Sequence, residues 1–222
     1  WRAMGAGLAG LLHLSALGAI GAPAVNALVR ALTSADPSAH AGAAEALGRI
    51  GPEAEPAMDA LIHALQSPYR EVRSKAAEAL GHIGASAVAR LVEAAKSNDE
   101  EVRAFAMQAL GQIGPNAAQA VPLLIEALGE DSRSIPKSAS QALVSLGAPA
   151  VPALIEALKS GNWTLQGAAA DALAGIGKDA VPSLMEVLET SEGDQKLLVL
   201  SVLGRIGPAA SAALPAILEA PR

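Results

Sequence analysis

Apolar residues recur along this chain at the spacing of a helix that is buried on one side. In the stretch AVPLLIEAL at 120–128, Val121, Leu124, Ile125 and Leu128 stand at positions i, i+3, i+4 and i+7. This spacing places the four side chains on one face of a helix. The stretches AVPALIEAL and AVPSLMEVL repeat the pattern further along the chain. We predict a helix at each stretch and call it an A helix.

A second pattern predicts a longer helix, which we call a B helix. In REVRSKAAEALGHIG at 70–84, Val72, Ala76, Leu80 and Ile83 fall on one face. The same pattern returns in EEVRAFAMQALGQIG. Each B helix contains an ALG-like stretch. We call the leucine of this stretch the central leucine and number the other positions of the helix from it. The central leucines are Leu17, Leu47, Leu80, Leu110, Leu143, Leu173 and Leu203.

Each B pattern is closed by a glycine that recurs at a regular interval. These glycines are Gly21, Gly51, Gly84, Gly114, Gly147, Gly177 and Gly207. Successive intervals are 30, 33, 30, 33, 30 and 30 residues. Glycine ends a helix at low cost because it enters the left-handed region without a steric penalty. The chain is therefore predicted to be a tandem array of two-helix repeats.

These intervals also predict the domain organisation, a single domain over 1–222. Its repeats each carry an A helix and then a B helix, at 22–51, 52–84, 85–114, 115–147, 148–177 and 178–207. A lone B helix at 1–21 and a lone A helix at 208–222 flank them. Both flanking helices are apolar on the outward side, where the terminus of a solenoid in water needs polar residues. We expect end-to-end self-association, or continuation of a longer solenoid.

A helix pair of this size cannot bury its own apolar face, so neighbouring pairs must stack. The predicted fold class is all-α, a solenoid of stacked antiparallel helix pairs. Prolines predict local departures from regularity. A helices should begin late or bend where they carry a proline, as at Pro122. Pro136 should shorten its B helix and leave 129–136 irregular. Val144 and Ala174 replace the glycine that follows the central leucine elsewhere, so their repeats should pack slightly wider.

The motif D-x-x-V-R-x-x-A-x-x-A-L-G-x-I-G followed by A-V-P-x-L-I-x-A-L, best preserved over 98–128, resembles short HEAT-like repeats of the phycobilisome lyase-like type. The resemblance covers essentially the whole chain and implies a right-handed, armadillo-like superhelix. It also implies that the B helices line a concave surface that grips partners. The Val-Arg pair is intact only at 72–73 and 102–103. Asp99, four residues before Arg103, suggests a ladder of ion pairs between adjacent repeats.

We predict the partner-binding residues by register, as the outward positions of the B helices and the aromatic residues near them. Phe105 is expected to face outward, and Tyr69 and Trp163 to lie along one edge of the same groove. Aromatic residues are frequent interface anchors. Alternatively, each covers local surface between repeats. The predicted set is Arg49, Tyr69, Lys75, Glu78, His82, Phe105, Gln108, Gln112, Gln141, Trp163 and Asp171.

Charge and composition exclude several kinds of function. The formal net charge of -6 disfavours nucleic acid as a partner. The chain has no cysteine, so it offers no thiol nucleophile and no cysteine-based metal site. Its histidines fall in different repeats without a metal-binding spacing. We therefore expect no enzyme activity, no catalytic residues, no metal and no cofactor.

The sequence leaves several functions open. We favour a non-catalytic scaffold that binds a protein or peptide along the B helices. One alternative, suggested by the resemblance alone, is a bilin lyase-like or chaperone-like subunit acting on a chromophore-bearing protein. Another is a structural subunit that assembles through its apolar ends. The uncharged run at 3–29 is long enough for a membrane span, but it is rich in Ala and Gly and fits the repeat register, so no membrane insertion is expected. The compartment stays open, with a soluble, cytoplasmic protein slightly favoured.

Overall fold

The computed structural model describes residues 24–34 and 36–213, and every regular element in this part of the chain is helical. The prediction of an all-α fold of stacked helix pairs is confirmed. The chain divides into two compact units, unit 1 at Trp1–Ala117 and unit 2 at Ala118–Arg222. Each unit is described by itself. The prediction of a single domain over 1–222 stays a prediction.

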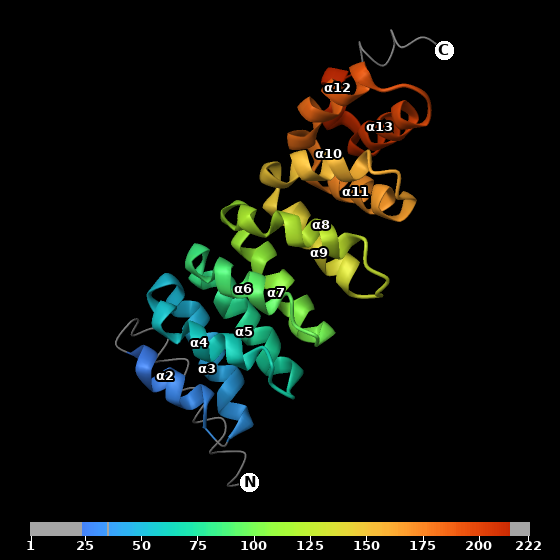
Figure 1. The fold of residues 1–222 in the computed structure, drawn as a ribbon. Coiled ribbons are helices and arrows are strands. Elements are labelled where there is room, and N and C mark those ends of the chain that lie inside the picture. The colour runs from blue at the N-terminus through green and yellow to red at the C-terminus, as the bar shows by residue number, and fades with distance from the viewer. Residues whose placement is uncertain (1–23, 35, 214–222) are drawn as a thin grey trace. The chain divides into compact units, whose positions relative to one another are not determined.

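In the described part of unit 1, A helices alternate with B helices. The A helices are α2 (Val25–Leu32), α4 (Met58–Ala64) and α6 (Val88–Ala94), and the B helices are α3 (Pro37–Ile50), α5 (Arg70–Ile83) and α7 (Glu100–Ile113). The 3-10 helices η2 (Gly51–Ala57) and η3 (Ala85–Ala87) lead into α4 and α6. Helix α3 packs on α5 and α5 on α7, so B helices form one layer of the unit, and the A helices form the other (Figure 1).

The described part of unit 2 repeats this arrangement. Its A helices are α8 (Val121–Leu128), α10 (Val151–Leu158) and α12 (Val181–Thr190), and its B helices are α9 (Ile135–Leu146), α11 (Trp163–Ile176) and α13 (Gly193–Ile206). The 3-10 helices are η4 (Gly114–Ala120), which crosses the division between units, η5 (Ala148–Ala150), η6 (Gly177–Ala180) and η7 (Gly207–Ala213). Helix α9 packs on α11 and α11 on α13, as in unit 1.

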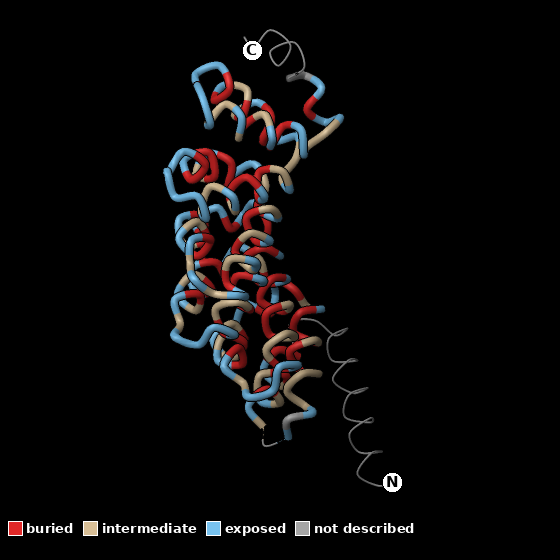
Figure 2. The backbone as a smooth tube through the Cα atoms, turned by 90° about the vertical axis from the view of Figure 1, so that its right-hand side faces the viewer, coloured by how far each residue is buried: buried red, intermediate tan, exposed pale blue. Residues whose placement is uncertain are grey.

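The core of each unit consists of aliphatic side chains between the two helix layers. The central leucines Leu47, Leu80, Leu110, Leu143 and Leu173 are fully buried. Alanine occupies many of the other buried positions, which lets helices approach closely. Figure 2 shows buried residues alternating with exposed ones along each helix, as the one-sided apolar pattern predicts.

The recurring glycines end the B helices, as predicted, although not in the helical left-handed region. Gly51, Gly84, Gly114, Gly147, Gly177 and Gly207 have φ between 69° and 90°. Their ψ values lie near -140°, for example -136° at Gly51 and -145° at Gly84. This combination is essentially restricted to glycine, because a side chain would clash there with the backbone. The chain therefore turns sharply at this point and enters the next 3-10 helix.

The prolines act as expected at the starts of helices. Helix α8 begins at Val121 with Pro122 in its first turn, after the 3-10 helix η4, so this A helix begins late. Helix α9 begins at Ile135 with Pro136 in its first turn and has 12 residues, whereas α7 has 14. Of the segment 129–136 that was predicted to be irregular, residues 129–134 are irregular. Both predictions are confirmed.

The flanking helices predicted at 1–21 and 208–222 lie largely outside the described residues, which include only 208–213 of the second. These six residues belong to the 3-10 helix η7. Among the described residues, no individual helix combines the length and apolar character that a membrane crossing requires. The segments Ile135–Leu146 and Ala148–Leu158, which meet at 118°, together have the length and composition of a membrane span, and only these two properties support that interpretation.

Candidate partner-binding surface

The outward positions of the B helices in unit 1 form a polar surface, as the register predicts. Arg49, His82, Gln108 and Gln112 are exposed. Lys75 and Glu78 are partly buried, and the Lys75 ammonium donates to the Glu78 carboxylate at 2.9 Å. This hydrogen bond raises the pKa of Lys75. On α3, Arg49 pairs with Glu45 at 2.5 Å.

Two of the predicted site residues also pack the repeats together. A side chain two positions after the central leucine lies over the glycine that follows the central leucine of the preceding B helix. A Cβ built on Gly48 would lie 3.3 Å from Nδ1 of His82, and one built on Gly81 would lie 2.5 Å from Oε1 of Gln112. His82 and Gln112 therefore pack against the preceding B helix, with Nδ1 and Oε1 directed toward its glycine.

The same contact is inverted between α9 and α11. Val144 stands where other B helices have glycine, and Gly175 stands where the following helix has His or Gln elsewhere. A Cβ on Gly175 would lie 2.8 Å from Cγ2 of Val144. The neighbouring repeat has thus lost the side chain that would otherwise meet Val144. The wider packing predicted for the repeats of Val144 and Ala174 stays a prediction.

Phe105 does not face outward, so this part of the prediction is wrong. Its side chain is only 8% exposed. The guanidinium carbons of Arg70 and Arg73, from the preceding B helix, lie 5.8 Å and 5.9 Å from the centre of its ring. These distances permit a cation–π interaction with each arginine. The ring is therefore covered by neighbouring side chains, because its position faces the preceding repeat.

An ion pair joins the same two repeats, with a different carboxylate from the one predicted. Arg73 and Arg70 of α5 both pair with Glu101 of α7, Arg70 at 3.4 Å. Asp99 instead caps α7, where its carboxylate accepts from the backbone N–H groups of Glu101 and Val102. Capping competes with pairing to an arginine of the neighbouring repeat, because the cap directs the Asp99 side chain along its own helix.

In unit 2 the outward positions are also polar, and one aromatic residue is almost fully exposed. Gln141 and Asp171 are exposed. Asp171 pairs with Arg205 of the next B helix at 2.7 Å. Trp163, the first residue of α11, is 83% exposed. Asn162 fixes its backbone by accepting hydrogen bonds from Thr164 and Leu165.

Tyr69 holds nearly the same place in unit 1 that Trp163 holds in unit 2. It is the N-cap residue of α5 and is 49% exposed, and its backbone N–H donates to the Ser67 hydroxyl at 3.2 Å. The two aromatic residues belong to different units. Their predicted alignment along one edge stays a prediction.

Two features of this surface were missed from the sequence. Leu197 on α13 is 65% exposed, although the helical pattern predicts no exposed leucine there. Its position six before the central leucine holds Ala, Ser, Lys or Gly in the other repeats, and this contrast was the available signal. The second feature is a link to the preceding connection, where Arg73 donates to the Ser67 carbonyl at 2.6 Å. His40, at the same place in its repeat, lies 2.7 Å from the Ser34 carbonyl.

The described residues contain no group of three His, Asp or Glu side chains that could hold a metal ion. A hollow of about 370 Å³ lies beside the A-to-B connections of α2–α3 and α4–α5. His40 and His63 are among its lining residues. The polar outward surface remains the candidate site.

Comparisons with known proteins agree with this architecture. A family model described as HEAT repeats matches residues 13–80, 58–145, 133–204 and 151–221. No curated protein matches the chain.

Several solved structures are similar to it. A structure of Kap95p with RanGDP has a TM-score of 0.56 at 17% identity, covering 90% of this chain and 34% of that one. Importin beta has a TM-score of 0.51 at 19% identity, covering 86% and 31%. The CpcE–CpcF complex of phycocyanin lyase from Nostoc sp. PCC7120 has a TM-score of 0.48 at 28% identity, covering 88% and 80%. Because the family matches together span nearly the entire sequence, this chain belongs to the HEAT-repeat family.

Proposed function

We propose that this protein is a non-catalytic scaffold that binds a protein or peptide along the outward surfaces of its B helices. The observation that carries the proposal is the exposed indole of Trp163. Only four residues of the chain are aromatic, and burying a large ring is among the main sources of stability in a folded core. An aromatic side chain that is 83% exposed contributes little to folding, so its value lies in contact with a partner.

The B-helix layer of unit 2 suits a peptide. Outward positions of α9, α11 and α13 carry amide, carboxylate and guanidinium groups, at Gln141, Asp171 and Arg205. Such groups donate to and accept from an extended backbone, while the indole contacts an apolar side chain. The backbone of Trp163 is held by the Asn162 cap, which reduces the entropy lost on binding.

This proposal is tested by selecting peptides from a random display library on the wild-type protein. The selected peptides should bind Trp163→Ala at least about tenfold more weakly, a loss of about 1.4 kcal/mol. Thr164→Ala is the matched control, because Thr164 is the exposed neighbour of Trp163 on the same turn. Equal affinity for wild type and Trp163→Ala would remove Trp163 from the site. A library that yields no binders would contradict peptide binding itself.

A further inference from the structure

Between α5 and α7, the chain binds a cation of its own with an aromatic ring and a carboxylate. Arg70 stands ten residues before the central leucine of α5. Its guanidinium carbon lies 5.8 Å from the centre of the Phe105 ring on α7, and its Nη1 lies 3.4 Å from Oε1 of Glu101. Phe105 and Glu101 stand five and nine residues before the central leucine of α7. Three positions on two neighbouring B helices therefore hold a cation, a ring and a carboxylate together.

The same positions of α11 and α13 in unit 2 hold a ring and a carboxylate but no cation. Trp163 stands at the position of Arg70, and Asp194 stands at the position of Glu101. Both Trp163 and Asp194 are exposed. Asp194 takes part in no ion pair among the described residues. No other two neighbouring B helices of the described repeats combine an aromatic residue with a carboxylate at these positions.

The adjacent positions do not replace the missing cation. Gln166 of α11 stands at the position of Arg73, which in unit 1 also lies beside the Phe105 ring. Lys196 follows Asp194 by two residues on α13. Side chains two residues apart in a helix do not face each other, so Lys196 points away from Asp194.

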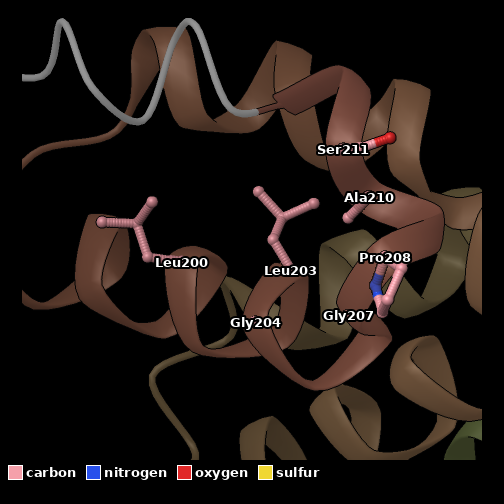
Figure 3. A pocket seen from close by; sticks show the side chains of 7 residues that line it. All are labelled: Leu200, Leu203, Gly204, Gly207, Pro208, Ala210 and Ser211. Carbon is pink, nitrogen blue, oxygen red and sulfur yellow. The ribbon is translucent and has the colours of Figure 1, made fainter.

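The side of α13 that faces α11 is the polar one. Helix α13 packs on α11, and the carboxylate of Asp171 pairs with Arg205 across this contact at 2.7 Å. The other side of α13 borders an open hollow of about 450 Å³, into which Leu200 and Leu203 project (Figure 3). The residues that line this hollow carry no charge. A polar contact with a partner is therefore expected on the side toward α11.

We propose that Trp163 and Asp194 bind a lysine or arginine side chain of the partner, which supplies the cation that Arg70 supplies in unit 1. This inference rests on the proposed function and specifies the chemistry of the peptide. The cation stacks on the indole, the ring that attracts cations most strongly, and pairs with the Asp194 carboxylate. The aliphatic stem of the same side chain gives the indole its apolar contact. Acidic residues outnumber basic ones in unit 2, which favours the approach of a basic peptide.

Peptides selected on the wild-type protein from two random display libraries, one complete and one without lysine and arginine, test this inference. Peptides that bind Trp163→Ala more weakly than the wild type should come from the complete library and carry a lysine or arginine. Replacing that residue by glutamine should weaken binding to the wild type at least about tenfold. Asp194→Asn should weaken binding of the unaltered peptide about threefold. Asp179→Asn removes the same charge from an exposed site elsewhere in unit 2 and should leave binding unchanged.

A double-mutant cycle shows whether the peptide cation and Asp194 act together. The glutamine replacement should weaken binding to Asp194→Asn less than binding to the wild type, because the carboxylate is no longer there to pair. Circular dichroism checks that each variant is folded. Trp163-dependent binders that arise equally well without lysine and arginine, or equal effects of Asp194→Asn and Asp179→Asn, would overturn this inference and leave peptide binding in place. A complete library without any Trp163-dependent binder would overturn both the proposed role of Trp163 and this inference.

Discussion

At the scale of single residues, the repeats are joined by pairs of positions that change together. A glycine on one B helix leaves room for a side chain on the next, as with Gly81 and Gln112. Between α9 and α11 the bulky and small partners are exchanged, with Val144 facing Gly175. At each of these contacts one side chain is large and the other is glycine. Because the helices are closely packed, one additional methyl group is expected to change the stability there.

This exchange predicts different effects for two glycines on α11. Gly167→Ala should raise the free energy of unfolding by about 0.5–1 kcal/mol, because alanine favours a helix and no atom lies within 4 Å of the new Cβ. Gly175→Ala should raise the free energy of unfolding by about 1 kcal/mol less than Gly167→Ala does. Its new Cβ would lie 2.8 Å from a methyl of Val144, whose β-branched side chain cannot easily rotate away. Urea denaturation measures both values.

The control for this pair is the Val144→Ala background, which removes the methyl that Gly175→Ala would meet. In this background the two alanine substitutions should give equal gains, a coupling of about 1 kcal/mol. If Gly175→Ala and Gly167→Ala gain equally with Val144 present, the exchanged packing does not exist.

At the scale of elements, the connection between A and B helices carries a recurrent serine. Ser67, Ser97, Ser132 and Ser160 each accept a hydrogen bond from the backbone N–H two residues later. Asp36, Asp99 and Asn162 then cap α3, α7 and α11. At Asp36 the hydrogen bond from the Ser38 hydroxyl lowers the pKa of the carboxyl group. These side chains satisfy N–H groups that the start of a helix leaves unpaired.

The cap on α7 predicts different effects for two substitutions of Asp99, one that removes the acceptor oxygen and one that keeps it. Asp99→Ala should lower the free energy of unfolding by about 1 kcal/mol, because the N–H groups of Glu101 and Val102 lose their acceptor. Asp99→Asn should cost only a few tenths of a kcal/mol, because the amide oxygen can still accept. Thermal denaturation of both variants measures the difference. Equal losses would show that the charge of Asp99, and not its cap, stabilises α7.

The elements could be predicted from the sequence because their signals are local. Glycine at each helix end, proline in the first turn and the spacing of leucines all act within one or two turns. The contacts between repeats could not be predicted so well. The direction of Phe105 depends on Arg70 and Arg73, which lie on another helix. The exposed position of Leu197 likewise depends on what packs beside α13, which the pattern within α13 cannot reveal.

At the scale of the whole molecule, both units consist of the same module, a helix pair that contacts mainly the pair before it and the pair after it. No pair buries its own leucines alone, so stability comes from neighbours and is roughly additive along the array. The outward positions of the B helices take little part in the core and are free to vary in chemistry. This separation explains why the sequence identifies the family, whereas the partner-binding role of Trp163 remains a proposal.

The central claim is that neighbouring helix pairs support one another and are otherwise interchangeable. It is tested most directly by inserting a tandem copy of residues 148–177 after Gly177 and measuring circular dichroism during thermal denaturation. The enlarged protein should have the same helical signal per residue as the wild type and a melting temperature at least as high, because the extra pair finds a neighbour on each side. A loss of helical signal per residue, or a melting temperature lower by more than about 5 °C, would contradict it.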